Sequence, residues 1–361
     1  MEKIFIGVDL HKHQITVCYL SKDGKERIEV YYFNHKGIES FIEQLKLLKE
    51  CGYSLELAVE TTGNSEYFYN QIKSYVDKVI ILNTLKLKPI MKSYKKTDKN
   101  DCRIIAFFLS KDMLEGYSVN MPSKEAKALR RLLKARYILM RARIGIKNQI
   151  HGILLGNGEE TKKRFLTSKK GRDNLRKMNY PEQSILNMLI DNIDNLDKQI
   201  NGIEIEIEDK VKKRSRENEI IQSIPGFGRI ISASIIAGID NIDRFEESKS
   251  LTAYVGLVPY VNNTGDEIKH GKITKTGPAY MRTALVQAVL AMLRSKEMRN
   301  HPLVLNYYKM KKAKCSGKAI IATARRLLSI IWVLLKRNET FDINYYFNSK
   351  VQIEKKLAMS I

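Results

Sequence analysis

The chain of 361 residues carries a formal net charge of +23, with 63 lysines and arginines against 40 acidic residues. A balance this basic is typical of proteins that bind a polyanion, most often nucleic acid. No apolar run approaches the roughly 18–20 residues of a membrane-spanning helix, and the first residues lack a signal-peptide pattern. The four cysteines are scattered without a CxxC pair, which argues against a zinc knuckle and a disulfide framework. We therefore expect a cytoplasmic protein of two or three domains that does not bind a membrane.

The first 82 residues predict a mixed α/β domain, because short alternating apolar runs are interspersed with segments of helical periodicity. We expect three strands at 3–10, 13–20 and 27–33, then a helix at 37–49, a strand at 55–60, a helix at 65–75 and a strand at 78–82. Three successive strands followed by alternating helices and strands resemble the element order of a ribonuclease H-like fold.

Four acidic residues occupy unusual places in this pattern. Asp9 lies within an apolar strand, Glu60 ends another, and Asp98 and Asp101 begin an apolar helical run. A carboxylate in such a strand is costly unless it is paired or binds a metal, and residues three apart share one helix face. Each has an ordinary alternative: Asp9 as a turn residue, Glu60 as a helix cap, and the aspartate pair as partners of nearby lysines and Arg103. Together they predict a site for Mg²⁺ or Mn²⁺.

In their order, Asp9, Glu60, Asp98 and Asp101 resemble the DEDD catalytic tetrad of a class of bacterial insertion-sequence transposases. In that family the N-terminal domain is similar to the Holliday-junction resolvase of the ribonuclease H superfamily. Residues 96–101, KTDKND, are close to the family's third motif. The resemblance covers most of the chain, and it implies a DNA transposase or recombinase whose tetrad holds one or two Mg²⁺ ions.

The middle of the chain is strongly basic. Residues 124–155 predict one long helix with a seven-residue apolar period, and residues 124–177 hold 17 Lys or Arg against 4 Asp or Glu. Although a charge run is often only a solvated face, an excess this one-sided predicts contact with a nucleic-acid backbone. The candidate contacts are Arg130, Arg131, Lys134, Arg141, Arg143 and Lys147.

A second long helix is expected at 181–216. Its leucines and isoleucines step by three and four residues without a break, which is the a/d pattern of a coiled coil. This apolar seam can pair with the helix at 124–155, pair with another protomer, or form an ordinary bundle core. We expect it to support self-association into a dimer or tetramer.

Two glycines, Gly226 and Gly228, precede an apolar helix at 230–237. Glycines at such a turn allow close backbone approach, and a helix N-terminus can hold a phosphate. The segment resembles a helix-hairpin-helix element, which binds DNA backbone without sequence preference. The alternative is a packing corner between two helices.

Residues 251–282 resemble the second conserved domain of the same transposases, in which a serine before a glycine is the recombination nucleophile. The matching residue here is Thr264, before Gly265. A threonine hydroxyl can attack a phosphodiester, although its methyl group crowds the oxygen. The alternative is that Thr264 is only a turn residue and this copy is impaired. Lys275 and Arg282 are candidates for phosphate contact. We assign no chemistry to the apolar helix expected at 317–337.

These patterns divide the chain into a ribonuclease H-like domain at 1–123, basic helices with a coiled coil at 124–216, and a mostly helical transposase domain at 217–361. The resemblance also implies that the two sites meet between protomers and that a noncoding guide RNA directs target choice. Two other functions fit the residues: a structure-selective, metal-dependent DNA nuclease in which Thr264 is inert, and a nucleic-acid-binding scaffold that has lost catalysis.

Overall fold

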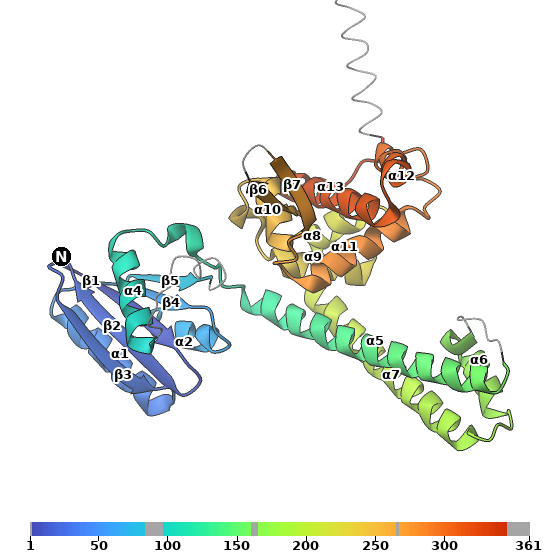
Figure 1. Ribbon diagram of the computed structural model, residues 1–361, viewed down its shortest axis with the longest axis horizontal. Coiled ribbons are helices and arrows are strands. Elements are labelled where there is room, and N and C mark those ends of the chain that lie inside the picture. The colour runs from blue at the N-terminus through green and yellow to red at the C-terminus, as the bar shows by residue number, and fades with distance from the viewer. Residues whose placement is uncertain (1, 84–96, 160–164, 265–266, 345–361) are drawn as a thin grey trace, which may run out of the picture. The chain divides into compact units, whose positions relative to one another are not determined.

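The computed structural model describes residues 2–83, 97–159, 165–264 and 267–344, and the chain forms two compact units that divide between Met121 and Pro122 (Figure 1). The long basic helices belong to the second unit, and the division into three functional domains stays a prediction. Among the described helices, none is both long enough and apolar enough to cross a membrane.

The first unit is a five-stranded sheet with helices on both faces, in the strand order β3-β2-β1-β4-β5. β1, β2 and β3 run antiparallel, whereas β4 and β5 run parallel to β1. The mixed α/β architecture predicted from the sequence is confirmed, with element ends shifted by at most a few residues. The strands are β1 (Lys3–Leu10), β2 (Gln14–Ser21), β3 (Glu26–Tyr32), β4 (Ser54–Glu60) and β5 (Lys78–Leu82), and the helices are α1 (His35–Glu50), α2 (Ser65–Ile72) and α4 (Asp98–Ser110).

Alternation along β1 decides which side chains meet which helices. Ile6 and Val8 pack in one core with α1 and α2, whereas Phe5 packs with α4 on the other face. Gly7 also faces α4, and a Cβ there would lie 2.1 Å from the carbonyl oxygen of Cys102. The backbone of α4 therefore rests directly on β1, close to Asp9.

In the second unit, the long helices α5 (Lys124–Gly156) and α7 (Gln183–Lys212) lie side by side and antiparallel (Figure 1). The short helix α6 (Lys169–Arg176) packs beside α7. Along the predicted a/d seam, the side chains buried in the chain's own core are Leu186, Ile193, Ile200 and Ile207. The seam is thus used within the chain. The alternate seam positions Leu189, Leu196 and Ile203 are half-buried, and self-association stays a prediction.

Ion pairs tie the two long helices together along their length. Arg136 on α5 contacts Glu204 on α7 at 2.6 Å, and Arg143 contacts Asp197. Arg172 on α6 is buried and pairs with Asp194 at 2.8 Å. Because buried charges are tolerated only when paired, these basic residues contribute to the fold of the hairpin.

We expect Ile193→Lys combined with Ile200→Lys to destabilise the helical hairpin by several kcal/mol. Both side chains are at most 5% exposed, and a lysine at either position buries an unpaired ammonium group. Thermal melting followed by circular dichroism should show a lower melting temperature for the second unit. Met188→Lys is the matched control, since that side chain on the same helix is 63% exposed and its replacement should leave melting unchanged.

The rest of the second unit is mostly helical. The helix expected at 181–216 ends at Lys212, and a new helix starts at Ser215. Arg214 at the break has non-helical backbone angles (φ −122°, ψ 48°), and its side chain donates hydrogen bonds to Glu217 and to the carbonyl of Asp240. The helices expected at 230–237 and 317–337 are present. The elements are α8 (Ser215–Gln222), α9 (Arg229–Ile239), α10 (Ser248–Val255), β6 (Pro259–Thr264), β7 (Glu267–Ile273), α11 (Ala279–Met292), α12 (Pro302–Ala313) and α13 (Ser316–Arg337).

Candidate metal centre and nucleic-acid interface

Two of the four predicted acids lie at neighbouring strand ends. β1 and β4 are parallel, with Val8 opposite Val59, so Asp9 and Glu60 follow as the next residues on adjacent strands. Residues in register on parallel strands point to the same face. Since Val8 and Val59 pack with α1 and α2, both acids belong to the opposite face, which α4 covers. Glu60 is half-buried there.

The other two acids open α4. Thr97 caps the helix by accepting a hydrogen bond from the Asn100 amide, so Asp98 and Asp101 fall in the first turn. The stripe of α4 that packs on the sheet includes Ile105, and a helix repeats its face every three to four residues. Asp98 and Asp101 continue that stripe toward the N-terminus of the helix. The predicted acids of α4 therefore lie on the side of the helix that faces the sheet.

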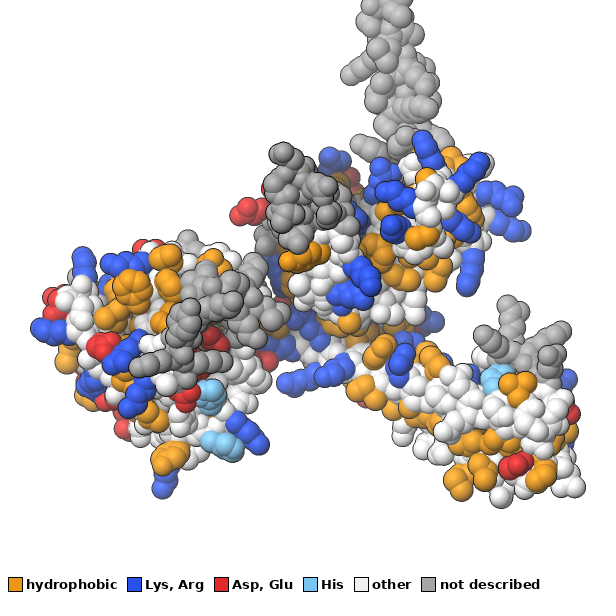
Figure 2. Space-filling view, viewed as in Figure 1, with side chains coloured by type: hydrophobic (Ala, Val, Ile, Leu, Met, Phe, Trp, Pro, Cys, Tyr) orange, Lys and Arg blue, Asp and Glu red, His pale blue; other side chains and the backbone are white. Residues whose placement is uncertain are grey.

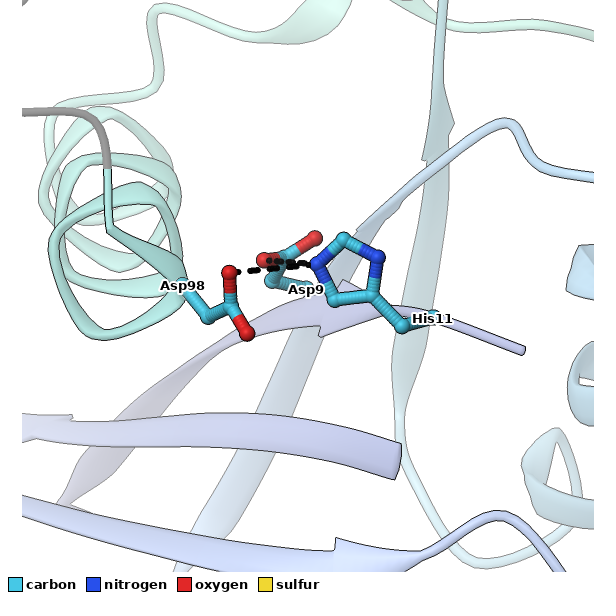
Figure 3. A group of neighbouring side chains, drawn as sticks. All are labelled: Asp9, His11 and Asp98. Carbon is cyan, nitrogen blue, oxygen red and sulfur yellow. Dashed lines mark ion pairs between the residues drawn. The ribbon is translucent and has the colours of Figure 1, made fainter. Parts of the chain in front are cut away.

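Three side chains form a cluster at this point, Asp9, Asp98 and His11 (Figure 3). The Nε2 atom of His11 lies 3.1 Å from Asp9 Oδ2 and 3.2 Å from Asp98 Oδ1. Gln14 on β2 donates a hydrogen bond of 2.9 Å to the other oxygen of Asp98. His11 and Gln14 are not among the site residues predicted from the sequence. His11 lies two residues after Asp9, just beyond the end of β1, and this spacing is the sequence feature from which it could have been predicted.

Among the residues that the structure describes, His11 is the ion-pair partner of the largely buried Asp9 carboxylate. The Asp9 side chain is 10% exposed, and no hydrogen bond from a described residue reaches its buried Oδ2. Burial raises the pKa of Asp9, the His11 charge opposes that shift, and Asp98 and Asp101 raise the pKa further. Arg103, an expected counterion, pairs instead with Glu26 at 2.6 Å, and Lys95 and Lys96 lie outside the described residues.

This donor set fits a divalent cation. Carboxylate oxygens converge from a strand and a helix, one of them buried and without a hydrogen bond, and a cation would supply the missing interaction. The ligand atoms of Asp9, His11 and Asp98 all lie within 4.8 Å of one another. Asp101 is near enough to Asp9 to raise its pKa, and Glu60 lies beside Asp9 by strand register.

Comparison with known proteins identifies the family. A model described as "Transposase IS116/IS110/IS902 family" matches residues 218–308, and a model of IS110-type DEDD transposases matches residues 6–157. Together they cover more than half of the chain. The chain belongs to the IS116/IS110/IS902 family of transposases. The N-terminal match contains Asp9, Glu60, Asp98 and Asp101, and the C-terminal match contains Thr264.

Curated relatives agree along nearly their whole length. The chain is 27% identical to the transposase for insertion sequence element IS1111A of Coxiella burnetii, over 93% of this chain and 90% of that protein. It is 25% identical to the pilin gene-inverting protein of Moraxella bovis, over 95% and 98%. It is 23% identical to a probable family 20 transposase of Pseudomonas aeruginosa, over 93% and 94%.

In this transposase, the predicted nucleophile Thr264 is the last residue of β6, and its backbone pairs with Glu267 on β7. Its side chain and residues 265–266 lie outside the described part of the structure. Lys275 is exposed just after the hairpin. Arg282 donates a hydrogen bond of 3.0 Å to the carbonyl of Val255, and burial lowers its pKa. That bond gives its guanidinium a structural role.

The two glycines before α9 differ in their surroundings. Gly226 has a φ of 97°, and a Cβ there would lie 2.6 Å from the carbonyl oxygen of Ala288 on α11. Glycine is therefore required at this position because a side chain would clash with the backbone of α11. Gly228 is the exposed N-cap of α9, with no atom within 4 Å of where a Cβ would lie, and its contact with a phosphate stays a prediction.

The basic residues predicted on α5 fall into two groups. Arg130 donates hydrogen bonds to the carbonyls of Ala237 and Gly238 at the end of α9, Arg143 pairs with Asp197, and burial lowers the pKa of Lys147. The other three are exposed, and no ion pair is described for them: Arg131, Lys134 and Arg141. Lys162, Lys163 and Arg164 lie outside the described residues.

A further basic surface covers α12 and the start of α13. It is not among the nucleic-acid contacts predicted from the sequence. Figure 2 shows lysine and arginine side chains gathered over α12. Residues 299–338 contain ten lysines and arginines and no acidic residue, a signal that was available in the sequence. We call its exposed members the α12–α13 lysines; they are Lys309, Lys311, Lys312, Lys314 and Lys318.

Proposed function

We propose that this transposase cuts and rejoins the DNA of an insertion sequence with a DEDD tetrad that binds Mg²⁺ or Mn²⁺ and with the hydroxyl of Thr264 as nucleophile. The observation that best supports the proposal is the buried Asp9 oxygen, which receives no hydrogen bond from the described part of the chain and lies opposite the acids of α4. The order of strands and the helix across them supports a ribonuclease H-like, resolvase-like first domain.

At the acidic cluster, Asp9, Asp98 and their neighbours Glu60 and Asp101 would hold the ion. When bound, a divalent ion stabilises the charge on the attacking and leaving oxygens of a phosphoryl transfer, and paired ions do so at both sides. Gln14 fixes the rotamer of Asp98 by its hydrogen bond, so that Oδ1 remains directed toward Asp9. β1 and α4 hold their carboxylates through direct backbone packing at Gly7.

In the C-terminal domain, the Thr264 Oγ1 loses its proton and attacks the phosphorus of one DNA strand. The bond to one deoxyribose oxygen breaks, and that oxygen takes up a proton and leaves as a free DNA hydroxyl. The product is a covalent ester between the chain and DNA, which a second DNA hydroxyl resolves during rejoining. The position of Thr264 at the family's serine, inside the matched residues 218–308, supports this assignment.

The test is strand cleavage and exchange on DNA that carries the ends of the element. We expect activity with Mg²⁺ or Mn²⁺, loss of activity in excess chelator, and a covalent protein–DNA adduct. Cleavage without an adduct would favour a metal-dependent nuclease that activates water. Binding without any cleavage would favour a scaffold that has lost catalysis.

DNA affinity should depend on the exposed basic residues and should fall steeply with salt. The expected log–log slope is about −0.9 for each phosphate that the protein neutralises on duplex DNA. Reversing Arg131, Lys134 and Arg141 to glutamate should weaken binding to many sequences alike, and the slope should become shallower by about one unit for each phosphate no longer neutralised. Fluorescence anisotropy over a salt series measures both quantities.

The matched control reverses three exposed lysines of the first unit, Lys22, Lys36 and Lys46, which changes the net charge equally. An equal loss of affinity in both triple variants would indicate only a net-charge effect and would contradict a binding surface on α5. A third variant, in which the α12–α13 lysines are replaced by glutamate, tests whether that surface contributes to DNA affinity.

The resemblance supports three further parts of the proposal. The active complex is a homodimer or homotetramer, a noncoding RNA from the element guides target choice, and the protein acts in the cytoplasm. Co-purification of RNA followed by sequencing tests the guide, and sedimentation with and without nucleic acid tests the assembly.

A further inference from the structure

The β1–β2 turn places a nitrogen donor inside the acidic cluster. The backbone amide of His11 donates a hydrogen bond of 2.9 Å to the Gln14 carbonyl, which fixes the turn directly after β1. The imidazole then projects over Asp9 and Asp98, as Figure 3 shows. Its Nε2 atom is nearly equidistant from one oxygen of each carboxylate, at 3.1 and 3.2 Å.

The two contacts of His11 have poor hydrogen-bond geometry, whereas their distances suit atoms that bind one metal ion as neighbouring ligands. One imidazole N–H cannot point well at two oxygens, and Asp9 Oδ2 accepts no hydrogen bond of acceptable geometry within the described residues. Around an octahedral ion with bonds of about 2.1–2.2 Å, neighbouring ligand atoms are about 3.0–3.1 Å apart. The observed spacings of 3.1 and 3.2 Å lie at or slightly above that value.

We propose that His11 Nε2 is a direct ligand of the ion at this site, together with Asp9 and Asp98, and that it makes the site prefer a first-row transition ion such as Mn²⁺ over Mg²⁺. This inference rests on the metal centre of the proposed function. Mg²⁺ prefers oxygen ligands alone, whereas an imidazole nitrogen suits transition ions. A site that adds an imidazole to its carboxylates differs in this respect from an all-carboxylate tetrad.

The experiment uses the full chain and Mn²⁺ as the probe. Titration followed by the electron paramagnetic resonance signal of free Mn²⁺ gives its affinity, and competition gives the affinity for Mg²⁺. Electron spin-echo modulation of the bound Mn²⁺ reports directly on a coordinated ¹⁴N nucleus. We expect ¹⁴N modulation in the wild type and none in His11→Ala.

His11→Ala should weaken Mn²⁺ binding about tenfold or more while Mg²⁺ binding changes by less than about threefold. His11→Gln offers an oxygen in place of the nitrogen and should likewise shift the preference toward Mg²⁺. His13→Ala is the matched control, since this second histidine of the same turn is also exposed and lies outside the cluster. It should retain wild-type affinities and ¹⁴N modulation.

Bound Mn²⁺ without ¹⁴N modulation, or an unchanged ratio of Mn²⁺ to Mg²⁺ affinity in His11→Ala, would overturn the inference and leave the metal centre standing. If the wild type binds neither ion, or if Asp98→Asn binds both as the wild type does, the metal centre itself is wrong and the inference falls with it. Circular dichroism of each variant checks that the fold is retained.

Discussion

Asp98→Ala or Asp101→Ala should reduce DNA strand cleavage by at least about a thousandfold while leaving the protein folded. Loss of the ion removes several kcal/mol of charge stabilisation from the phosphoryl transfer, and each 1.4 kcal/mol is about tenfold in rate. Both residues lie in the half-exposed first turn of α4, so alanine leaves no cavity in the core. Cleavage of end-labelled DNA under single-turnover conditions measures the loss.

Glu43→Ala is the matched control for these variants. Glu43 is an acid on α1, which covers the face of the sheet away from α4, so its removal should leave cleavage unchanged. Thermal melting should be similar for all three variants. Full cleavage by both Asp98→Ala and Asp101→Ala, or by the wild type in excess chelator, would contradict a catalytic metal centre at this place.

Thr264→Ala should abolish strand exchange and adduct formation and leave DNA binding and metal binding intact. The substitution removes the attacking oxygen and changes little else. Thr264→Ser should retain or raise activity, because a serine hydroxyl is less hindered by its neighbours than a threonine hydroxyl. The decisive measurement traps the covalent adduct on a suicide DNA substrate and maps the modified residue by mass spectrometry.

Other hydroxyl groups near this hairpin give the alternatives. Ser248 and Ser250 begin α10, and Tyr260 on β6 is 60% exposed. An adduct on any of these would move the nucleophile assignment and leave the transposase reaction in place. Cleavage that persists in Thr264→Ala without any adduct would instead favour a nuclease that uses water.

The sequence was sufficient for the secondary structure of both units wherever one periodicity dominated. β1 and β4 read as apolar strands, and α5 and α7 read as long helices with a seven-residue repeat, because each must bury one face. The order of the four acids along those elements also predicted their shared place in the first unit. Strand register and the stripe of α4 place Asp9 and Asp98 around His11, while their catalytic role stays a prediction.

The sequence did not reveal which basic residues are committed to the fold. Arg130 and Arg131 are adjacent and chemically identical, yet Arg130 donates hydrogen bonds to the end of α9, whereas Arg131 is exposed. The difference depends on a partner more than a hundred residues away. Local periodicity describes one helix at a time, so it contains no information on what lies against each face.

The acids of the candidate site could therefore be predicted from the sequence, whereas the histidine beside them could be recognised only in the folded structure. The sequence by itself determined the order of the four acids, the basic character of the chain and the place of Thr264 in its motif, since composition, element order and motif are properties of the chain alone. Only the tertiary structure shows that the α7 seam packs against α5 and that the backbone of α4 lies directly on Gly7. It also shows that His11 lies beside Asp9 and Asp98. The physical reason is that these contacts join separate elements, and packing and strand register fix them only when the chain has folded.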